Sequence, residues 1–86
     1  MRQIKFEAEA MAELEDWIKL HPKTALKIVD LLQETCISPF DGKGKPEPLK
    51  HKFKGLWSRR ITDEHRLIYE VTESFISVLS CKGHYQ

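Results

Sequence analysis

The 86-residue sequence has no long apolar segment and no pattern of a secretory leader. A membrane-spanning helix needs about 20 consecutive apolar residues, and no run in this chain approaches that length. The opening residues, MRQIKFEAEA, also lack the apolar stretch of a signal peptide. We therefore expect a cytoplasmic protein with no membrane partner.

Cysteine is scarce as well, with Cys36 and Cys81 as the two in the chain. Two cysteines do not make the disulfide framework of a small secreted domain, so we predict two buried free thiols. The chain is long enough for one hydrophobic core and too short for two, which predicts a single domain over residues 1–86.

Positive charge is concentrated in one part of the chain, although the net charge is only +1. Residues 1–40 contain five Lys or Arg and seven acids, whereas residues 43–66 contain eight basic residues and three acids. Such a basic stretch is typical of a surface that binds a polyanion, most often a nucleic acid. An ordinary solvated lysine face would give the same composition.

The N-terminal half predicts a short strand and two helices. Gln3–Phe6 suits a strand, and helical periodicity begins at Ala8. Pro22 is well placed to begin the second helix, and Ser38-Pro39 ends it. The link is so short that the helices should pack as an antiparallel hairpin. The expected core stripes are Ala10, Leu14, Trp17 and Ile18, then Ala25, Ile28, Val29, Leu32 and Cys36.

The C-terminal half alternates with a period of two, which is typical of strands. We expect strands over residues 56–62, 66–71 and 75–82, separated by turns short enough for hairpins. Trp57 and Ile61 should lie on one side of their strand, and Leu67, Tyr69 and Val71 on one side of theirs. The predicted fold class is α+β, with an N-terminal antiparallel helix hairpin packed on one face of a curved, mainly antiparallel sheet.

A basic, turn-rich segment, GKGKPEPLKH, holds the acid Glu47 between two prolines. Each proline fixes its own φ and favours an extended conformation at the residue before it, so we expect Lys45 and Glu47 to be extended. Glu47 would then be presented on a stiff segment.

Other polar residues come from segments that a meander makes neighbours: Lys50, His51, Arg59 or Arg60, His65, Arg66, His84 and Tyr85. A carboxylate, an imidazole, guanidiniums and an aromatic ring suit RNA cleavage by the ribose 2′-hydroxyl. That reaction needs a base, an acid and fixed cations beside the phosphate, and an aromatic ring can stack on a base.

Each of these residues also has an ordinary structural interpretation. Glu47 could pair with Lys45 or Lys50, Arg66 could pair with Glu64, and His84 could be a solvated terminal residue. His51, His65 and Glu64 show no metal-binding spacing, so we expect neither a metal nor a cofactor. The site hypothesis therefore depends on the co-occurrence of the residues.

Several ordered motifs together resemble the YoeB-type toxins of the RelE superfamily. The similarity is continuous from about Ser38 to Tyr85 and looser over the helices. The motifs are Pro39-Phe40, GKGKPEPLKH at 42–51, Gly55 with WSRRI at 57–61, EHRLIY at 64–69, and His84-Tyr85.

This resemblance implies a RelE-like fold and a toxin of a type II toxin–antitoxin pair that cuts mRNA in the ribosomal A site without a metal. It implies that Glu47 is the general base, that Arg66 stabilises the phosphoryl transition state, and that His84 is the general acid. The implied partners are a YefM-like antitoxin, the ribosome with its mRNA, and a second copy in a homodimer. Residues expected to bind or orient the RNA are Lys50, His51, Arg59 and Tyr85.

Two other functions remain open at this point. A binding module on the RelE/ParE fold could have lost the chemistry, although it would have no reason to keep Glu47, Arg66 and His84 together. A DNA-binding repressor fits less well, because both predicted helices carry apolar stripes that the core needs.

Overall fold

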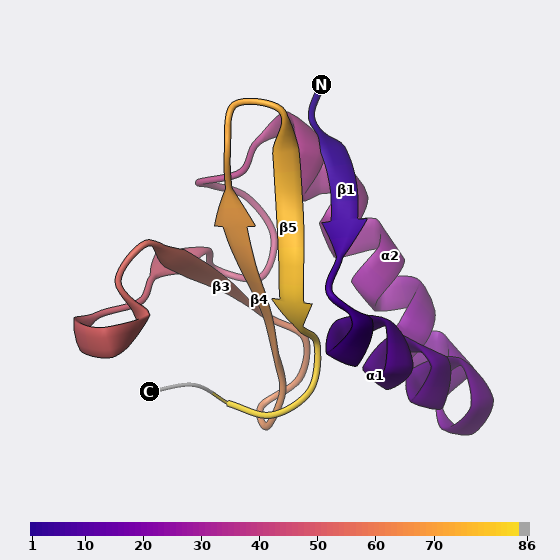
Figure 1. Ribbon diagram of the computed structural model, residues 1–86. Helices are drawn as coiled ribbons and strands as arrows, with labels where there is room; N and C mark the ends of the chain where they lie inside the picture. The colour runs from indigo at the N-terminus through magenta and orange to yellow at the C-terminus, as the bar shows by residue number, and fades with distance from the viewer. Residues whose placement is uncertain (85–86) are drawn as a thin grey trace.

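The computed structural model describes residues 1–84, which form two helices and a five-stranded sheet (Figure 1). The chain order is β1, α1, α2, β2, a short 3₁₀ helix η1, β3, β4 and β5. Both helices lie on the same side of the sheet, as predicted. The eight elements have the bounds β1 Gln3–Phe6, α1 Ala8–Leu20, α2 Pro22–Ile37, β2 Glu47–Pro48, η1 His51–Phe53, β3 Leu56–Arg60, β4 Arg66–Val71 and β5 Phe75–Ser80.

The sheet has the strand order β1-β5-β4-β3-β2. Its last four members in this order pair antiparallel, whereas β1 pairs with β5 in parallel, with Phe6 opposite Val78. The N-terminal strand β1 thus forms one edge of the sheet, and β2 forms the other edge. The mainly antiparallel sheet expected from the sequence is confirmed.

The helices cover the sheet with the two predicted stripes, and only His21 separates them. The stripes are wrong at two positions, because Ile18 is 56% exposed and Val29 is 41% exposed. Leu31 and Thr35 are buried instead, which moves the inward face of α2 by a fraction of a turn. Glu13 is half-buried and accepts hydrogen bonds from Ser80 Oγ (3.0 Å) and the Cys81 N–H (2.8 Å).

In the strands, the predicted alternation holds for the core, since Ile61, Leu67 and Tyr69 are fully buried beneath the helices. Trp57 is half-buried, and its ring centroid lies 4.9 Å from that of Phe40. No helix within residues 1–84 has the length and apolar character needed to cross a bilayer.

Both cysteines are buried and unpaired, as predicted. The Sγ of Cys81 lies 3.6 Å from the carbonyl oxygen of Ala10, inside the core. Burial, together with the nearby Glu13 carboxylate, raises the pKa of the Cys81 thiol to about 12. Because the thiolate is the nucleophile, this thiol should be inert in the native protein.

We expect Cys81 to react with iodoacetamide at pH 8 roughly a thousandfold more slowly in the native protein than in urea, because so little thiolate forms. Mass spectrometry of the labelled peptides measures the two rates. An exposed cysteine introduced by Glu73→Cys provides the control, since it should react at similar rates in both states. Equal rates for Cys81 in the two states would contradict its burial.

Candidate functional site

The three residues to which the resemblance assigns catalytic roles line one cavity of about 160 Å³. Glu47 comes from β2, Arg66 from the start of β4, and His84 from the segment after β5. The cavity lies on the sheet face away from the core. Its remaining lining residues are Gly44, Lys45, Leu49, Ser58 and Arg60. The cavity thus combines one carboxylate and one imidazole with three cationic side chains.

Strand pairing places Glu47 in the cavity. Glu47 lies opposite Ser58 in the β2–β3 register, and the Arg60 N–H donates to the carbonyl of Gly44 at 2.7 Å. Gly44 has a φ of +80°, and a Cβ there would lie 3.0 Å from the Arg60 carbonyl oxygen, so this close approach favours glycine.

The backbone just before the acid is partly different from the prediction. Glu47 is extended within β2, but Lys45 has a φ of +50°, in the left-handed region. The preference that Pro46 imposes on Lys45 is therefore overridden, because the turn must bring Gly44 against β3. A non-glycine residue in this conformation costs on the order of 1–3 kcal/mol, and the surrounding contacts must hold it.

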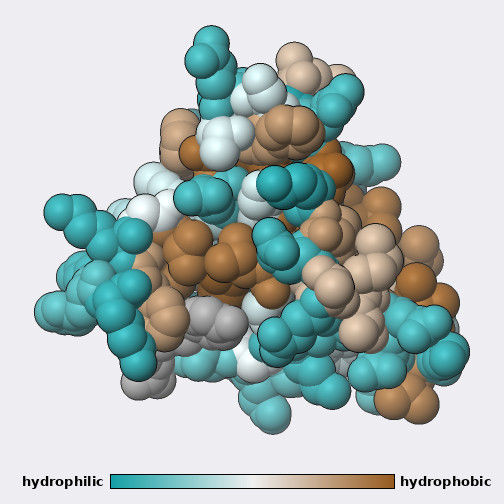
Figure 2. Space-filling model, in the orientation of Figure 1, coloured by the Kyte–Doolittle hydropathy of each residue, from teal (hydrophilic) through white to brown (hydrophobic). Residues whose placement is uncertain are grey.

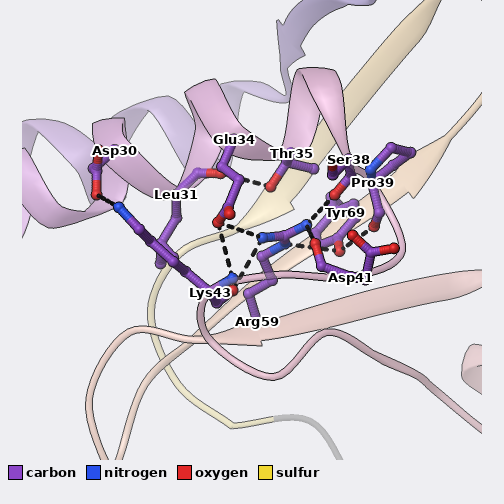
Figure 3. Close-up of polar contacts among 10 residues, drawn as sticks. All are labelled: Asp30, Leu31, Glu34, Thr35, Ser38, Pro39, Asp41, Lys43, Arg59 and Tyr69. Carbon is purple, nitrogen blue, oxygen red and sulfur yellow. Dashed lines mark hydrogen bonds and ion pairs between the residues drawn. The ribbon is translucent and has the colours of Figure 1, made fainter.

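Arg59 holds the earlier part of this loop, residues 38–43, from inside the protein, which corrects its assignment to RNA binding (Figure 3). Its side chain is 0% exposed and forms an ion pair with Glu34 at 3.1 Å. The same guanidinium donates to the carbonyl oxygens of Lys43 (3.0 Å), Asp41 (2.9 Å) and Ser38. A guanidinium that is buried and saturated by protein acceptors cannot contact a phosphate. Arg60, the next residue, is exposed and lines the cavity.

Tyr69 and Glu34 complete this buried network (Figure 3). The Tyr69 hydroxyl accepts from Arg59 Nε at 3.2 Å and donates to the Pro39 carbonyl at 2.8 Å. Burial raises the pKa of Tyr69, and the Arg59 guanidinium partly opposes this effect. Glu34 also accepts the Lys43 N–H at 2.9 Å. The loop that leads to Glu47 is thus tied to α2 and to the core strands.

Arg66 is held at the cavity wall by its own turn. Its Nη1 donates to the carbonyl oxygens of Thr62 (2.7 Å), Asp63 (3.2 Å) and His65 (3.2 Å). Within residues 1–84 no ion pair joins Arg66 to Glu64, nor Glu47 to Lys45 or Lys50. The alternative ion-pair interpretations of both residues are therefore wrong.

Of the residues expected to contact RNA, Lys50 and His51 lie outside the cavity lining. Both are exposed at the beginning of η1, where hydrophilic side chains cover the projecting loop (Figure 2). Tyr85 lies outside the described residues. Sequence reasoning missed Lys45 and Ser58 as lining residues, and it committed to Arg59 in place of Arg60. The period-two pattern could have identified the lining residues of β3, since it placed Ser58 and Arg60 on the other side of the strand from Trp57.

A second groove continues from the cavity and shares Gly44, Lys45 and Arg60 with it. It also contains Lys27 and Lys43. Lys43 Nζ lies 3.0 Å from Asp30 Oδ2, and this carboxylate raises the pKa of Lys43. Positive charge therefore extends past the cavity along the loop and α2.

Comparisons with known proteins agree with this geometry. The YoeB toxin of Escherichia coli K12 is 49% identical over 69 residues, which cover 80% of this chain and 82% of the relative. A YoeB/ParE toxin structure from Agrobacterium tumefaciens superposes with a TM-score of 0.93 at 39% identity, covering 96% of this chain and 99% of the other. YoeB from Staphylococcus aureus, solved as a dimer and in complex with YefM, gives TM-scores of 0.91 and 0.88 at 38% and 37% identity, with at least 98% of each chain covered.

The fold is therefore that of the RelE superfamily of toxins, as the sequence motifs implied. The profile of one family within it, the YoeB-like toxins of bacterial type II toxin–antitoxin systems, matches residues 6–85. The chain belongs to this family.

Replacement of Arg59 should destabilise the protein, because its side chain is buried in the network that holds the loop. We expect Arg59→Ala to lower the free energy of unfolding by roughly 3 kcal/mol or more, because Glu34 and three carbonyls lose a buried partner. Arg60→Ala, the matched exposed control, should change it by about 0.5 kcal/mol or less. Urea denaturation followed by circular dichroism measures both. A similar midpoint for the two variants would contradict the network's role.

Proposed function

We propose that this toxin is a metal-independent endoribonuclease that cuts mRNA in the ribosomal A site and so inhibits translation. The observation that carries the proposal is the convergence of Glu47, Arg66 and His84 on one cavity from three separate segments. A module that only binds its target needs no such combination of acid, base and cations.

In this mechanism Glu47 accepts the proton of a ribose 2′-hydroxyl, and the resulting oxygen attacks the adjacent phosphorus. Arg66 and the neighbouring Lys45 and Arg60 stabilise the negative charge that develops on the phosphoryl oxygens. His84 donates a proton to the departing 5′-oxygen. The products are a 2′,3′-cyclic phosphate, or the 3′-phosphate derived from it, and a 5′-hydroxyl.

The ribosome has a role in this proposal as the holder of the RNA. Three cationic side chains share the cavity with one carboxylate, so the cavity suits a phosphate-rich ligand. An assembled ribosome holds the mRNA in a fixed position, whereas a naked RNA is flexible and is rarely aligned for in-line attack. Cleavage should consequently be slow for the free protein with naked RNA and fast on an assembled ribosome.

The relatives also suggest the protein partners. Because S. aureus YoeB, which is 37% identical, has been solved in complex with YefM, we propose a YefM-like antitoxin as the cognate partner. The S. aureus YoeB dimer supports a homodimer here. In the cell, the antitoxin would occlude or distort the cavity until it is removed.

Removal of either proton-transfer group should slow the reaction without unfolding the chain. We expect Glu47→Ala and His84→Ala each to reduce cleavage by roughly 10²–10⁴-fold, because general acid–base catalysis is worth about that factor. Mapping of mRNA 5′ ends in a translating extract measures the rate. Glu73→Ala, an exposed carboxylate on the β4–β5 turn, serves as the control. Parental activity in both test variants would remove the basis of the proposed mechanism.

Lys50 tests the contribution of the exposed loop. If its ammonium contacts a phosphate, Lys50→Ala should lower the slope of log K against log salt concentration by about 0.7, as expected for one contact to a single strand. Binding is measured by fluorescence anisotropy with a 2′-deoxy oligonucleotide that cannot be cleaved. Lys19→Ala, on the exposed face of α1, should leave the slope unchanged. An unchanged slope for Lys50→Ala would exclude the contact.

A further inference from the structure

His65 lies immediately before β4 and contacts the C-terminal segment that carries His84. Its Nδ1 accepts the N–H of Gly83 at 2.9 Å, and the carbonyl of Gly83 accepts the Arg66 N–H, also at 2.9 Å. Both backbone polar groups of Gly83 are thus bound by two consecutive residues, the last of the β3–β4 connection and the first of β4. The turn and the final segment lie together below the sheet in Figure 1.

The imidazole itself is fixed from several sides. Its ring packs edge-on against Trp17, with a centroid distance of 4.9 Å and an interplanar angle of 84°. Trp17 Nε1 donates to the carbonyl of Cys81 at 2.8 Å, so the indole binds the same C-terminal segment two residues earlier. The His65 carbonyl accepts the N–H groups of Ile61 (3.0 Å) and Thr62 (3.2 Å). His65 therefore joins the rigid core to the end of the chain.

Gly83 gives this contact its importance. Its φ is +87°, and a Cβ placed there would meet nothing within 4 Å, so packing does not restrain it. Glycine has the largest conformational freedom of any residue. Loss of the acceptor for its N–H would remove one of the two hydrogen bonds that hold the Gly83 backbone, and would widen the range of conformations that place His84 relative to Glu47 and Arg66.

We propose that His65 is a positioning residue for the reaction, and that its Nδ1 holds Gly83 so that the His84 imidazole stays in the cavity. The inference rests on the proposed function, in which His84 acts on the leaving oxygen. It requires the neutral tautomer of His65 with its proton on Nε2, because only an unprotonated Nδ1 can accept a hydrogen bond. His65 itself lines a separate pocket beside Trp17 and contributes nothing to the lining of the catalytic cavity.

Two substitutions separate hydrogen bonding from packing. His65→Asn places an amide oxygen near the position of Nδ1 but removes the ring from Trp17. His65→Phe keeps a ring against Trp17 but removes the acceptor. If Nδ1 positions the segment, Asn should preserve the function and Phe should lose it, whereas a purely structural packing role predicts the reverse.

The first measurement is hydrogen exchange of the Gly83 amide by NMR in the free protein. We expect slow exchange in the parent and in His65→Asn, and exchange roughly fivefold or more faster in His65→Phe, as expected for the loss of one net hydrogen bond. This measurement needs no substrate, so it decides the structural part of the proposal even if the protein cleaves no RNA. Equal protection in the parent and His65→Phe would overturn it.

The second measurement is single-turnover cleavage on programmed ribosomes over a range of toxin concentrations. We expect His65→Phe to lower the maximal rate roughly 10- to 100-fold, because small displacements of a catalytic group are costly. The half-saturating concentration should change by less than about twofold, since His65 lies outside the cavity. His65→Asn should recover the maximal rate to within about threefold.

The activity outcomes remain distinguishable. A parental rate in His65→Phe, or a loss in His65→Asn equal to that in His65→Phe, would overturn the positioning role while leaving the proposed nuclease intact. An inactive parent would instead remove the proposed function and, with it, the catalytic part of this inference.

Discussion

The buried guanidinium of Arg59 is the interaction on which the rest of the structure depends. Desolvating a cation costs several kcal/mol unless acceptors surround it, and here a carboxylate, a phenol oxygen and three carbonyls do so. Residues 38–43 therefore have to wrap around one side chain. The loop held in this way leads directly to Gly44, which bonds to Arg60, and then to Glu47 in the sheet.

The two faces of the sheet differ in what they support: one packs against the helices, and the other carries the polar cavity. Leu67 and Tyr69 point into the core, while Ser58, Arg60 and Arg66 belong to the opposite, polar face. Because β2, β3 and β4 are neighbours, groups that lie 19 residues apart in the sequence, such as Glu47 and Arg66, line the same cavity. The C-terminal segment joins them through backbone bonds at Gly83.

Much of this arrangement follows from the sequence alone. Sequence periodicities of 3.6 and two residues placed both helices and four of the five strands within about two residues of their observed bounds, because burial of one face dictates both patterns. The two-residue strand β2 is too short to show such a pattern and was not predicted. Helix faces were less certain: Ile18 and Val29 fit an apolar stripe, yet the crossing of α1 and α2 leaves them exposed. The apolar stripe of one helix does not predict the angle at which the other helix packs against it.

The candidate site was predictable to a similar extent. Glu47, Arg66 and His84 do meet, but the role of Arg59 was misjudged, since arginine on a basic segment resembles a phosphate ligand. Parity along β3 already put Arg59 on the side of Trp57 and Ile61. The Arg59 guanidinium can be buried because acceptors from Glu34, Ser38, Asp41 and Lys43 surround it. No local sequence pattern predicts that these acceptors come together.

The short strand β2 has a consequence for nonspecific pairing between the edges of sheets. Glu47–Pro48 forms one margin of the sheet, and proline has no N–H with which to bond another strand. A margin of two residues that ends in an imino acid is a poor template for edge-to-edge growth. The same segment that places the Glu47 carboxylate in the cavity therefore also makes this margin of the sheet a poor site for aggregation.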